Sequence, residues 1–140
     1  MRKGLAVDDL GNLVKLPLLA VLATYRQDGT VLLSPVWHEW REGGFQVITR
    51  SRDVKAVHLR RDPRASIVVC EHTPPYRGIE VRCQVKLITE GTSDAVKRIA
   101  SRYLGAETGA AYSESAGDDL LIRLQPGELR AWDFVDDFYS

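Results

Sequence analysis

The residues with the clearest capacity for chemistry lie between Thr49 and Lys55, where an apolar strand gives way to a helix. Thr49 and Ser51 offer hydroxyl donors, and Arg50 and Lys55 offer positive charges. The first N–H groups of a helix carry partial positive charge, and charged donors bond phosphate about twice as strongly as neutral ones. The segment therefore predicts an anion site, the alternative being solvated basic side chains on an exposed helix.

A second candidate lies in residues 34–40, which read Ser-Pro-Val-Trp-His-Glu-Trp. Pro35 has no N–H for a strand ladder, so it marks an edge or a bulge, where a flat ligand can approach the backbone. Trp37 and Trp40 have rings of a size to flank an aromatic ligand. The alternative is that one tryptophan packs in the core and the other lies at an interface.

Metal and nucleophile chemistry has weaker support. Cys70, His72 and Cys83 lack zinc-finger spacing, and both cysteines fall in apolar strands, where a thiol is normally inert. The sequence has no P-loop, dinucleotide-binding glycine motif, nucleophile elbow or His-Glu-x-x-His motif. We therefore expect no metal site and no catalytic side chain, although His38 and Tyr76 are candidates for donating a proton.

The composition bounds the class of protein. With 140 residues, 44% of them hydrophobic and 27% charged, the chain fits one ordered domain over residues 1–140. The longest apolar run, residues 17–23, is far shorter than the roughly 20 residues of a membrane helix. No secretory signal is evident, and two cysteines give no disulfide framework, so we expect a cytoplasmic protein.

The net charge of zero disfavours nucleic acid or a membrane surface as a partner, but it hides an uneven distribution. Residues 41–64 hold seven basic residues against three acidic ones, a net charge of +4. Residues 114–140 hold seven acidic residues against two basic ones, a net charge of −5. The positive charge is therefore concentrated around the candidate anion site.

The elements that must position these residues are mostly strands. Apolar or alternating runs bounded by turn residues predict strands over residues 18–25, 31–40, 45–49, 65–71, 79–89, 119–124 and 128–134. Asp28-Gly29 predicts a tight hairpin turn because both positions tolerate positive φ, and residues 42–44 predict a second turn. Pro126-Gly127 is expected to separate the last two strands.

Helices are predicted over residues 5–14, from Ser51 or Asp53 to Arg61, and from Thr92 or Ser93 to Leu104. Residues 105–117 are expected to form a flexible connection. Six or seven strands, mostly adjacent in sequence, indicate a mainly β domain with peripheral helices. Closure into a small antiparallel barrel is favoured because it protects the sheet edges.

Four stretches form one recognisable pattern: Leu22-Ala23-Thr24 with Asp28-Gly29, Ser34-Pro35-Val36-Trp37, residues 55–67, and Ala131-Trp132-Asp133-Phe134. With this pattern, residues 17–134 resemble the split β-barrel flavin and deazaflavin oxidoreductases of the pyridoxamine 5'-phosphate oxidase-like superfamily, especially its F-420-dependent branch. The resemblance implies an FMN-binding type of split barrel. It also implies a homodimer with two cofactor sites at the subunit interface.

The cofactor-binding residues implied by the resemblance fall into two sets. Those lining the tricyclic ring would be Ser34, Pro35, Val36 and Trp37, with Ile48 and Thr49 beside it. Those holding phosphate or an anionic tail would be Arg50, Ser51, Lys55 and Arg61.

Departures from the family pattern bear on the identity of the cofactor. Pyridoxamine phosphate oxidases themselves carry Arg-x-x-Leu-Leu-Lys on the second strand and Ser-Arg-Lys before the helix. This chain has Thr-Val-Leu-Leu-Ser-Pro at residues 30–35 and Asp53-Val54-Lys55 before the helix. Only the lysine is kept, so the clamp for the FMN phosphate is incomplete. That favours coenzyme F-420, whose polyanionic tail can lie along residues 50–61.

The resemblance then implies an oxidoreductase that transfers hydride from reduced F-420 to a small conjugated acceptor, such as an enone or a quinone. The cofactor would carry the chemistry, and the protein would supply position and exclusion of water. Two alternatives stay open. One is an FMN-dependent oxidoreductase on the same barrel, and the other is a non-enzymatic flavin, deazaflavin or haem binding protein.

Overall fold

The computed structural model describes residues 1–115 and 117–139, and seven strands make up most of it. The strands are β1 (Ala20–Tyr25), β2 (Val31–Val36), β3 (His38–Arg41), β4 (Gly44–Arg50), β5 (Arg64–Cys70), β6 (Arg77–Ile88) and β7 (Asp119–Asp133). They form one antiparallel sheet in the order β2-β1-β5-β6-β7-β4-β3. The predicted mainly β architecture is confirmed.

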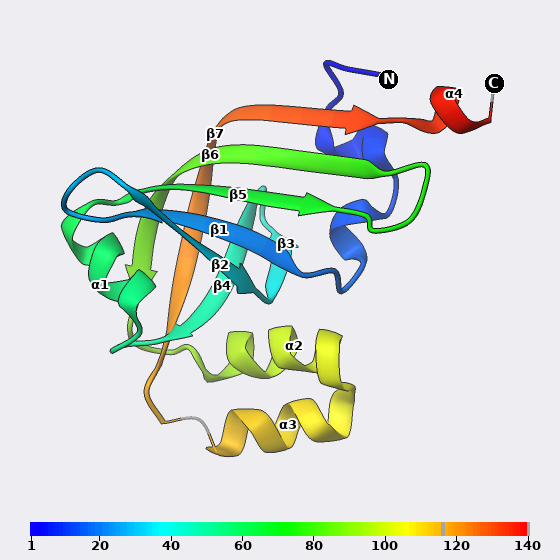
Figure 1. The fold of residues 1–140 in the computed structure, drawn as a ribbon. Coiled ribbons are helices and arrows are strands. Elements are labelled where there is room, and N and C mark those ends of the chain that lie inside the picture. Colours follow the sequence, from blue (N-terminus) through cyan, green and yellow to red (C-terminus); the bar gives the residue numbers. More distant parts are fainter. Residues whose placement is uncertain (116, 140) are drawn as a thin grey trace.

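The connection between β2 and β3 explains why the sheet curls. These strands stand at opposite ends of the sheet order, yet only Trp37 separates them in the chain. The sheet must therefore bend until its two ends approach each other, giving the half-closed, split barrel visible in Figure 1. The sequence predicted a single strand over residues 31–40. The structure corrects this to two strands broken at Trp37, which places Trp37 at the seam of the barrel.

Helices lie around the barrel (Figure 1). They are α1 (Val54–Arg61), α2 (Ser93–Leu104), α3 (Ala106–Ser115) and α4 (Val135–Phe138), with short 3-10 helices at Val7–Leu10 and Leu13–Lys15. The helix predicted over residues 5–14 was wrong in type, because Gly11 at φ 61° interrupts the run and leaves two single turns. Among the described residues, no helix is both long and apolar enough to cross a membrane.

The predicted flexible connection over residues 105–117 was also wrong. Residues 106–115 form α3, which packs against α2 as the second arm of a helical hairpin. Gly109 is the contact point between the two helices, since a Cβ there would stand 2.5 Å from the backbone of Ser101. Tertiary packing therefore overrides the low helix propensity of glycine at this position. Residue 116 lies outside the described residues.

The last strand continues where the sequence predicted a break. Pro126, which has no N–H, stands opposite Cys83, next to a register shift between Val81 and Cys83. Such a bulge bends a strand pair and accommodates a proline. β6 and β7 bend together partway along their length, as Figure 1 shows, and so connect the two halves of the barrel.

Both hairpin turns lie at the predicted positions, but the β1–β2 turn has one residue with positive φ instead of the two that were expected. Glu42 and Gly43 both have positive φ, at 52° and 74°, and join β3 to β4 as a two-residue hairpin turn. In the β1–β2 hairpin, by contrast, only Gly29 has positive φ, and the Asp28 carboxylate accepts bonds from the N–H and hydroxyl of Thr30.

The core lies inside the curled sheet. The alternation of Ile79, Val81, Cys83, Val85 and Leu87 in the sequence predicts one apolar face for β6. Ile79, Val81 and Cys83 are buried, and Val85 and Leu87 are half-buried. The largest fully buried side chains include Phe45, Leu10, Leu13, Leu22, Ile67 and Ile122. A smaller apolar cluster under α2 contains Ile48, Val96, Ile99 and Leu121, with Trp37, Tyr103 and Tyr112 packed at its border. Ile48, Trp37 and Tyr112 of this second cluster also line the candidate site.

Candidate functional site

A cavity of about 320 Å³ opens beside the seam between β2 and β3. It is lined by Leu19, Pro35, Val36, Trp37, Ile48, Lys55 and Tyr112. Five of these seven residues belong to the sets implied by the family pattern. The cavity is mostly apolar and carries one cationic group, Lys55, so it suits a flat apolar ring that bears an anion. We call it the Trp37 pocket.

Aromatic stacking fixes the position of Trp37. Its ring lies parallel to that of Tyr103 on α2, with centroids 5.2 Å apart and an interplanar angle of 10°. Tyr112 on α3 approaches the same ring at 5.5 Å with a tilt of 56°. Trp40 instead packs edge-on against Phe45 in the core. The two tryptophans therefore do not share a site, and only Trp37 lines the pocket.

The helical hairpin α2–α3 is held to the barrel by partly buried polar contacts. Arg98 on α2 donates three hydrogen bonds of 2.6–3.0 Å to Glu39 on β3, and Gln46 donates one more at 2.8 Å. The Tyr103 hydroxyl donates to the carbonyl of Leu18 and accepts from the N–H of His38. These bonds fix the helix that stacks Tyr103 on Trp37, and the close α2–α3 contact then carries Tyr112 to the pocket.

The predicted phosphate donors gather at the end of β4, but a carboxylate of the chain itself occupies them. Asp53 Oδ2 accepts from the Thr49 hydroxyl at 2.8 Å and from the Arg50 N–H at 3.2 Å, and it lies 3.5 Å from Lys55 Nζ. The bond from Thr49, more than any other contact, holds the pKa of Asp53 below its usual range. Asp53 is therefore ionised at neutral pH.

A second carboxylate lies at the same end of α1. The Ser51 hydroxyl donates to Asp118 Oδ1 at 2.6 Å, and the Ser51 N–H donates to the Asp118 carbonyl at 2.9 Å. Asp118, from the predicted −5 segment, thus lies against Ser51, in the middle of the +4 segment. The sequence anticipated both segments, but not that they meet.

The remaining predicted residues lie around the pocket or away from it. Thr49 is buried behind Ile48, and Ser34 is half-buried on β2. Arg50 is exposed at the end of β4. Arg61 lies at the opposite end of α1 from Lys55, and its guanidinium donates to the carbonyl of Tyr25. The structure therefore brings Lys55, but not Arg61, to the Trp37 pocket.

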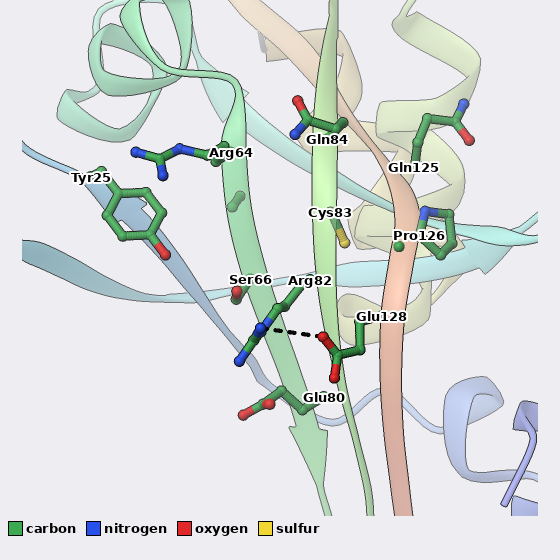
Figure 2. A pocket seen from close by; sticks show the side chains of 12 residues that line it. Tyr25, Arg64, Ser66, Glu80, Arg82, Cys83, Gln84, Gln125, Pro126 and Glu128 are labelled. Atoms are coloured by element: carbon green, nitrogen blue, oxygen red, sulfur yellow. Dashed lines mark hydrogen bonds and ion pairs between the residues drawn. The ribbon is translucent and has the colours of Figure 1, made fainter.

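A larger cavity of about 730 Å³ lies elsewhere, over the outer face of β5, β6 and β7 (Figure 2). Its charged side chains already have partners: Arg82 pairs with Glu128 at 3.3 Å, and Arg64 pairs with Asp62 at 2.8 Å and covers the ring of Tyr25. None of the predicted site residues lines it. Despite its smaller volume, the Trp37 pocket is therefore the candidate site.

Three features of the site were not predicted from the sequence. Leu19 and Tyr112 line the pocket, and the Asp53 carboxylate bonds to the predicted phosphate donors. Tyr112 falls in residues 105–117, the segment expected to be flexible. The usable signal was the set of helix-favouring alanines at 106, 110 and 111 with glutamates at 107 and 114.

Burial makes His38 a source of acid sensitivity rather than a proton donor to the pocket. The side chain is fully buried against Phe45 and Tyr103. Desolvation, with a smaller contribution from the charge of Arg102, lowers the pKa of His38 from 6.5 to about 4. The folded protein thus resists a proton that the unfolded chain accepts, so stability is full above pH 6.5 and decreases as the pH falls towards about 4.

Because of His38, we expect the free energy of unfolding to decrease by about 3 kcal/mol as the pH is lowered from 6.5 to 4. Urea denaturation at half-unit pH intervals measures the slope. In the His38→Leu variant, which keeps an apolar side chain at the site, the slope between pH 6.5 and pH 5 should largely disappear. An equal slope in the variant would show that other groups cause it.

Comparison with known proteins places the chain in a recognised group. The family model described as pyridoxamine 5'-phosphate oxidase matches residues 8–133. Among curated proteins, no sequence matches the chain.

Solved structures share the fold. A conserved hypothetical protein from Mycobacterium tuberculosis superposes with a TM-score of 0.78 at 24% identity, over 93% of this chain and 86% of that one. An F-420 reductase gives 0.69 at 24% identity, over 84% and 93% of the two chains. The haem storage protein HutZ from Vibrio cholerae gives 0.70 at 18% identity, over 88% and 92%. At these identities the likeness shows the split barrel fold alone.

Proposed function

This chain belongs to the pyridoxamine 5'-phosphate oxidase family, and on that premise we propose that it is a flavin- or deazaflavin-dependent oxidoreductase whose cofactor binds in the Trp37 pocket. The observation that carries the proposal is the convergence of Pro35, Val36, Trp37, Ile48 and Lys55 on one cavity. Pro35, Val36 and Trp37 are consecutive, but Ile48 on β4 and Lys55 on α1 come from other elements, and only the fold brings them to the same cavity.

In this proposal, apolar and aromatic residues of the pocket contact the cofactor ring, and Lys55 binds the phosphate. Pro35 and Val36 offer apolar surface at the edge of the sheet, and Trp37 offers a rigid ring held by its stack on Tyr103. Tyr112 covers part of the pocket from α3, and burial raises the pKa of its hydroxyl. Lys55 supplies the positive charge for a phosphate.

When bound, a reduced flavin or deazaflavin supplies the hydride, so the protein needs no catalytic side chain of its own. The chain's residues position the ring and exclude water from one side of it. His38 cannot reach the pocket because it is fully buried beneath Tyr103. The acceptor we propose is a small conjugated molecule, such as an enone or a quinone, which approaches the open side of the ring.

Among cofactors we favour F-420 over FMN. The stretch Asp53-Val54-Lys55 provides a single cation where a compact phosphate clamp needs more. Arg50, Arg52, Arg60 and Arg61 are all exposed on or beside α1, where a long anionic tail can reach them. The structural likeness to an F-420 reductase is consistent with this choice.

A second copy of the chain is proposed to complete the site. Apolar side chains are exposed next to the pocket: Leu19 at 50%, Leu33 at 65% on β2, and Val54 and Val57 at 59% and 52% on α1. Exposed apolar surface of this kind is typical of an interface. We therefore propose a homodimer that buries this face and closes the pocket between subunits.

The dimer predicts a mass of about 31 kDa in solution, twice the 15.7 kDa of one chain. Light scattering at micromolar concentration measures it. The variant Leu33→Asp should shift the mass towards one chain, because it places a charge on the proposed interface. A mass of one chain for the unaltered protein contradicts the dimer.

Turnover separates an enzyme from a carrier. The purified protein is mixed with reduced F-420 and, in turn, with reduced FMN, and oxidation of the cofactor is followed against a panel of enones and quinones. Acceptor-dependent oxidation supports the proposed function. Firm binding with no turnover across the panel favours a binding protein instead.

A further inference from the structure

We propose that Asp53 is an internal anion that occupies the phosphate donors of the Trp37 pocket, and that a ligand's phosphate must displace it to bind. Asp53 then lowers the affinity for a compact phosphate at these donors, as in FMN, relative to the same ring without phosphate, whereas the anionic tail of F-420 can lie along the exposed arginines of α1. The inference rests on the proposed function, because it concerns the same pocket.

The geometry of the carboxylate carries the argument. Three donors converge on a single oxygen, Asp53 Oδ2: the Thr49 hydroxyl at 2.8 Å, the Arg50 N–H at 3.2 Å and Lys55 Nζ at 3.5 Å. A side-chain hydroxyl, a backbone N–H and an ammonium group are the donors that an oxygen of a phosphate ester would use. Lys55 belongs to the pocket wall, so this cluster of donors adjoins the cavity.

The Asp53 carboxylate bonds to donors that precede the helix, although its position in the chain offers it other partners. Asp53 is the N-cap residue of α1, where an aspartate normally accepts from the N–H groups of the first helical turn. Here the carboxylate bonds to Thr49 and Arg50 instead, and the Asp53 carbonyl accepts from the N–H groups of Ala56 and Val57. These bonds to the Asp53 carbonyl are the ordinary first bonds of a helix, so the first-turn N–H groups have no side-chain cap and the carboxylate bonds to donors that precede the helix instead.

Displacement is sterically simple. The Asp53 side chain is 40% exposed, so a rotation about its side-chain bonds moves the carboxylate into water. Thr49 is 5% exposed, so its hydroxyl needs an acceptor within the protein or from a ligand. A phosphate oxygen meets that need when Asp53 leaves. Both anions cannot stay, because two like charges sharing one group of donors repel each other.

The test compares FMN with riboflavin, which has the same ring but no phosphate. Dissociation constants are measured by fluorescence for the unaltered protein, for Asp53→Asn, and for Asp62→Asn as a matched control. Asp62 lies at the other end of the same helix, paired with Arg64, so its substitution changes the net charge equally.

We expect Asp53→Asn to bind FMN about tenfold more tightly, the scale expected from removing one nearby like charge. Riboflavin affinity should stay within about twofold, and Asp62→Asn should change neither. Asp53→Ser, which keeps a residue favoured at an N-cap, should act in the same direction if the asparagine variant folds poorly.

Other outcomes overturn the inference. An unchanged ratio of FMN to riboflavin affinity in the two Asp53 variants would mean that Asp53 only supports the local structure. Weaker FMN binding in both Asp53 variants would mean that Asp53 contacts the ligand favourably. If no protein of the set binds FMN, riboflavin or F-420, the proposed function itself fails, and the role of Asp53 falls with it.

Discussion

Replacing Arg98 with methionine is expected to lower the free energy of unfolding by about 3 kcal/mol, the low end of the range for breaking a buried ion pair. The Glu39 side chain is only 6% exposed and accepts three bonds from Arg98, so the substitution leaves a buried carboxylate with Gln46 as its remaining donor. The low end applies because the Arg98 side chain is 35% exposed, so water moderates the loss. Urea denaturation measures the change.

The pH dependence of the same variant gives a sharper test. Burial alone raises the pKa of Glu39, but the bonds from Arg98 and Gln46 outweigh it and hold that pKa below 4.5. In the unaltered protein this pair stabilises the fold above pH 4.5 and is lost as the pH falls. Without Arg98, burial dominates and the folded state disfavours the ionised Glu39 carboxylate. The variant therefore loses more stability as the pH rises above 4.5. The gap in stability between the two proteins should therefore shrink on acidification.

Lys97→Met is the matched control, because Lys97 is the exposed neighbour of Arg98 on α2 and its loss changes the net charge equally. It should alter the free energy of unfolding by less than about 0.5 kcal/mol. A comparable loss in both variants would indicate that charge or helix propensity, rather than the bond to Glu39, is responsible. The Arg98 variant should also bind cofactor less tightly, since α2 holds Tyr103 against Trp37.

Substitution of Lys55 by alanine is expected to weaken cofactor binding by about 1.5–3 kcal/mol, the scale of a hydrogen bond to a charged group. Among the residues that the structure describes, Lys55 is the one cation in the wall of the Trp37 pocket, and its side chain is 19% exposed, so solvent replaces it poorly. Titration of FMN and F-420 against both proteins measures the change. The free energy of unfolding should change little, because Lys55 only adds to bonds that Asp53 already makes with Thr49 and Arg50.

Lys86→Ala serves as the control for the lysine variant. Lys86 is an exposed lysine on β6 and lines neither cavity. Its replacement should leave the dissociation constants within about twofold. Unchanged binding in Lys55→Ala would remove Lys55 from the phosphate site and, with it, the argument that the Trp37 pocket carries the anion.

Local chemistry allowed much of this fold to be predicted from the sequence. The alternation of Ile79, Val81 and Cys83 correctly assigned the buried face of β6, because every second side chain of a strand points the same way. Pro35 correctly marked an edge strand, since β2 ends the sheet order. The predicted Pro35, Val36, Trp37, Ile48 and Lys55 do meet at one cavity.

What escaped prediction depends on tertiary contacts. Gly109 favours loop in isolation, and only its contact with Ser101 explains why it belongs to a helix. Pro126 is typical of a strand break unless the bulge beside it in β7, where Gly127 and Glu128 stand opposite Arg82 of β6, is known. Asp53 could be placed at the N-cap, but the direction of its carboxylate is set by Thr49 and Arg50, which the fold brings to it. The meeting of Ser51 with Asp118 links residues 67 positions apart.

The central claim is that the Trp37 pocket binds a flavin or deazaflavin, and a titration of the purified protein with F-420 and with FMN tests it most directly. Quenching of tryptophan fluorescence reports on the pocket, because Trp37 forms its wall. We predict saturable binding of F-420 at one site per chain, tighter than that of FMN, with the quenching reduced in Trp37→Phe. The absence of saturable binding for both cofactors, or equal quenching in the Trp37 variant, would contradict the assignment of this pocket.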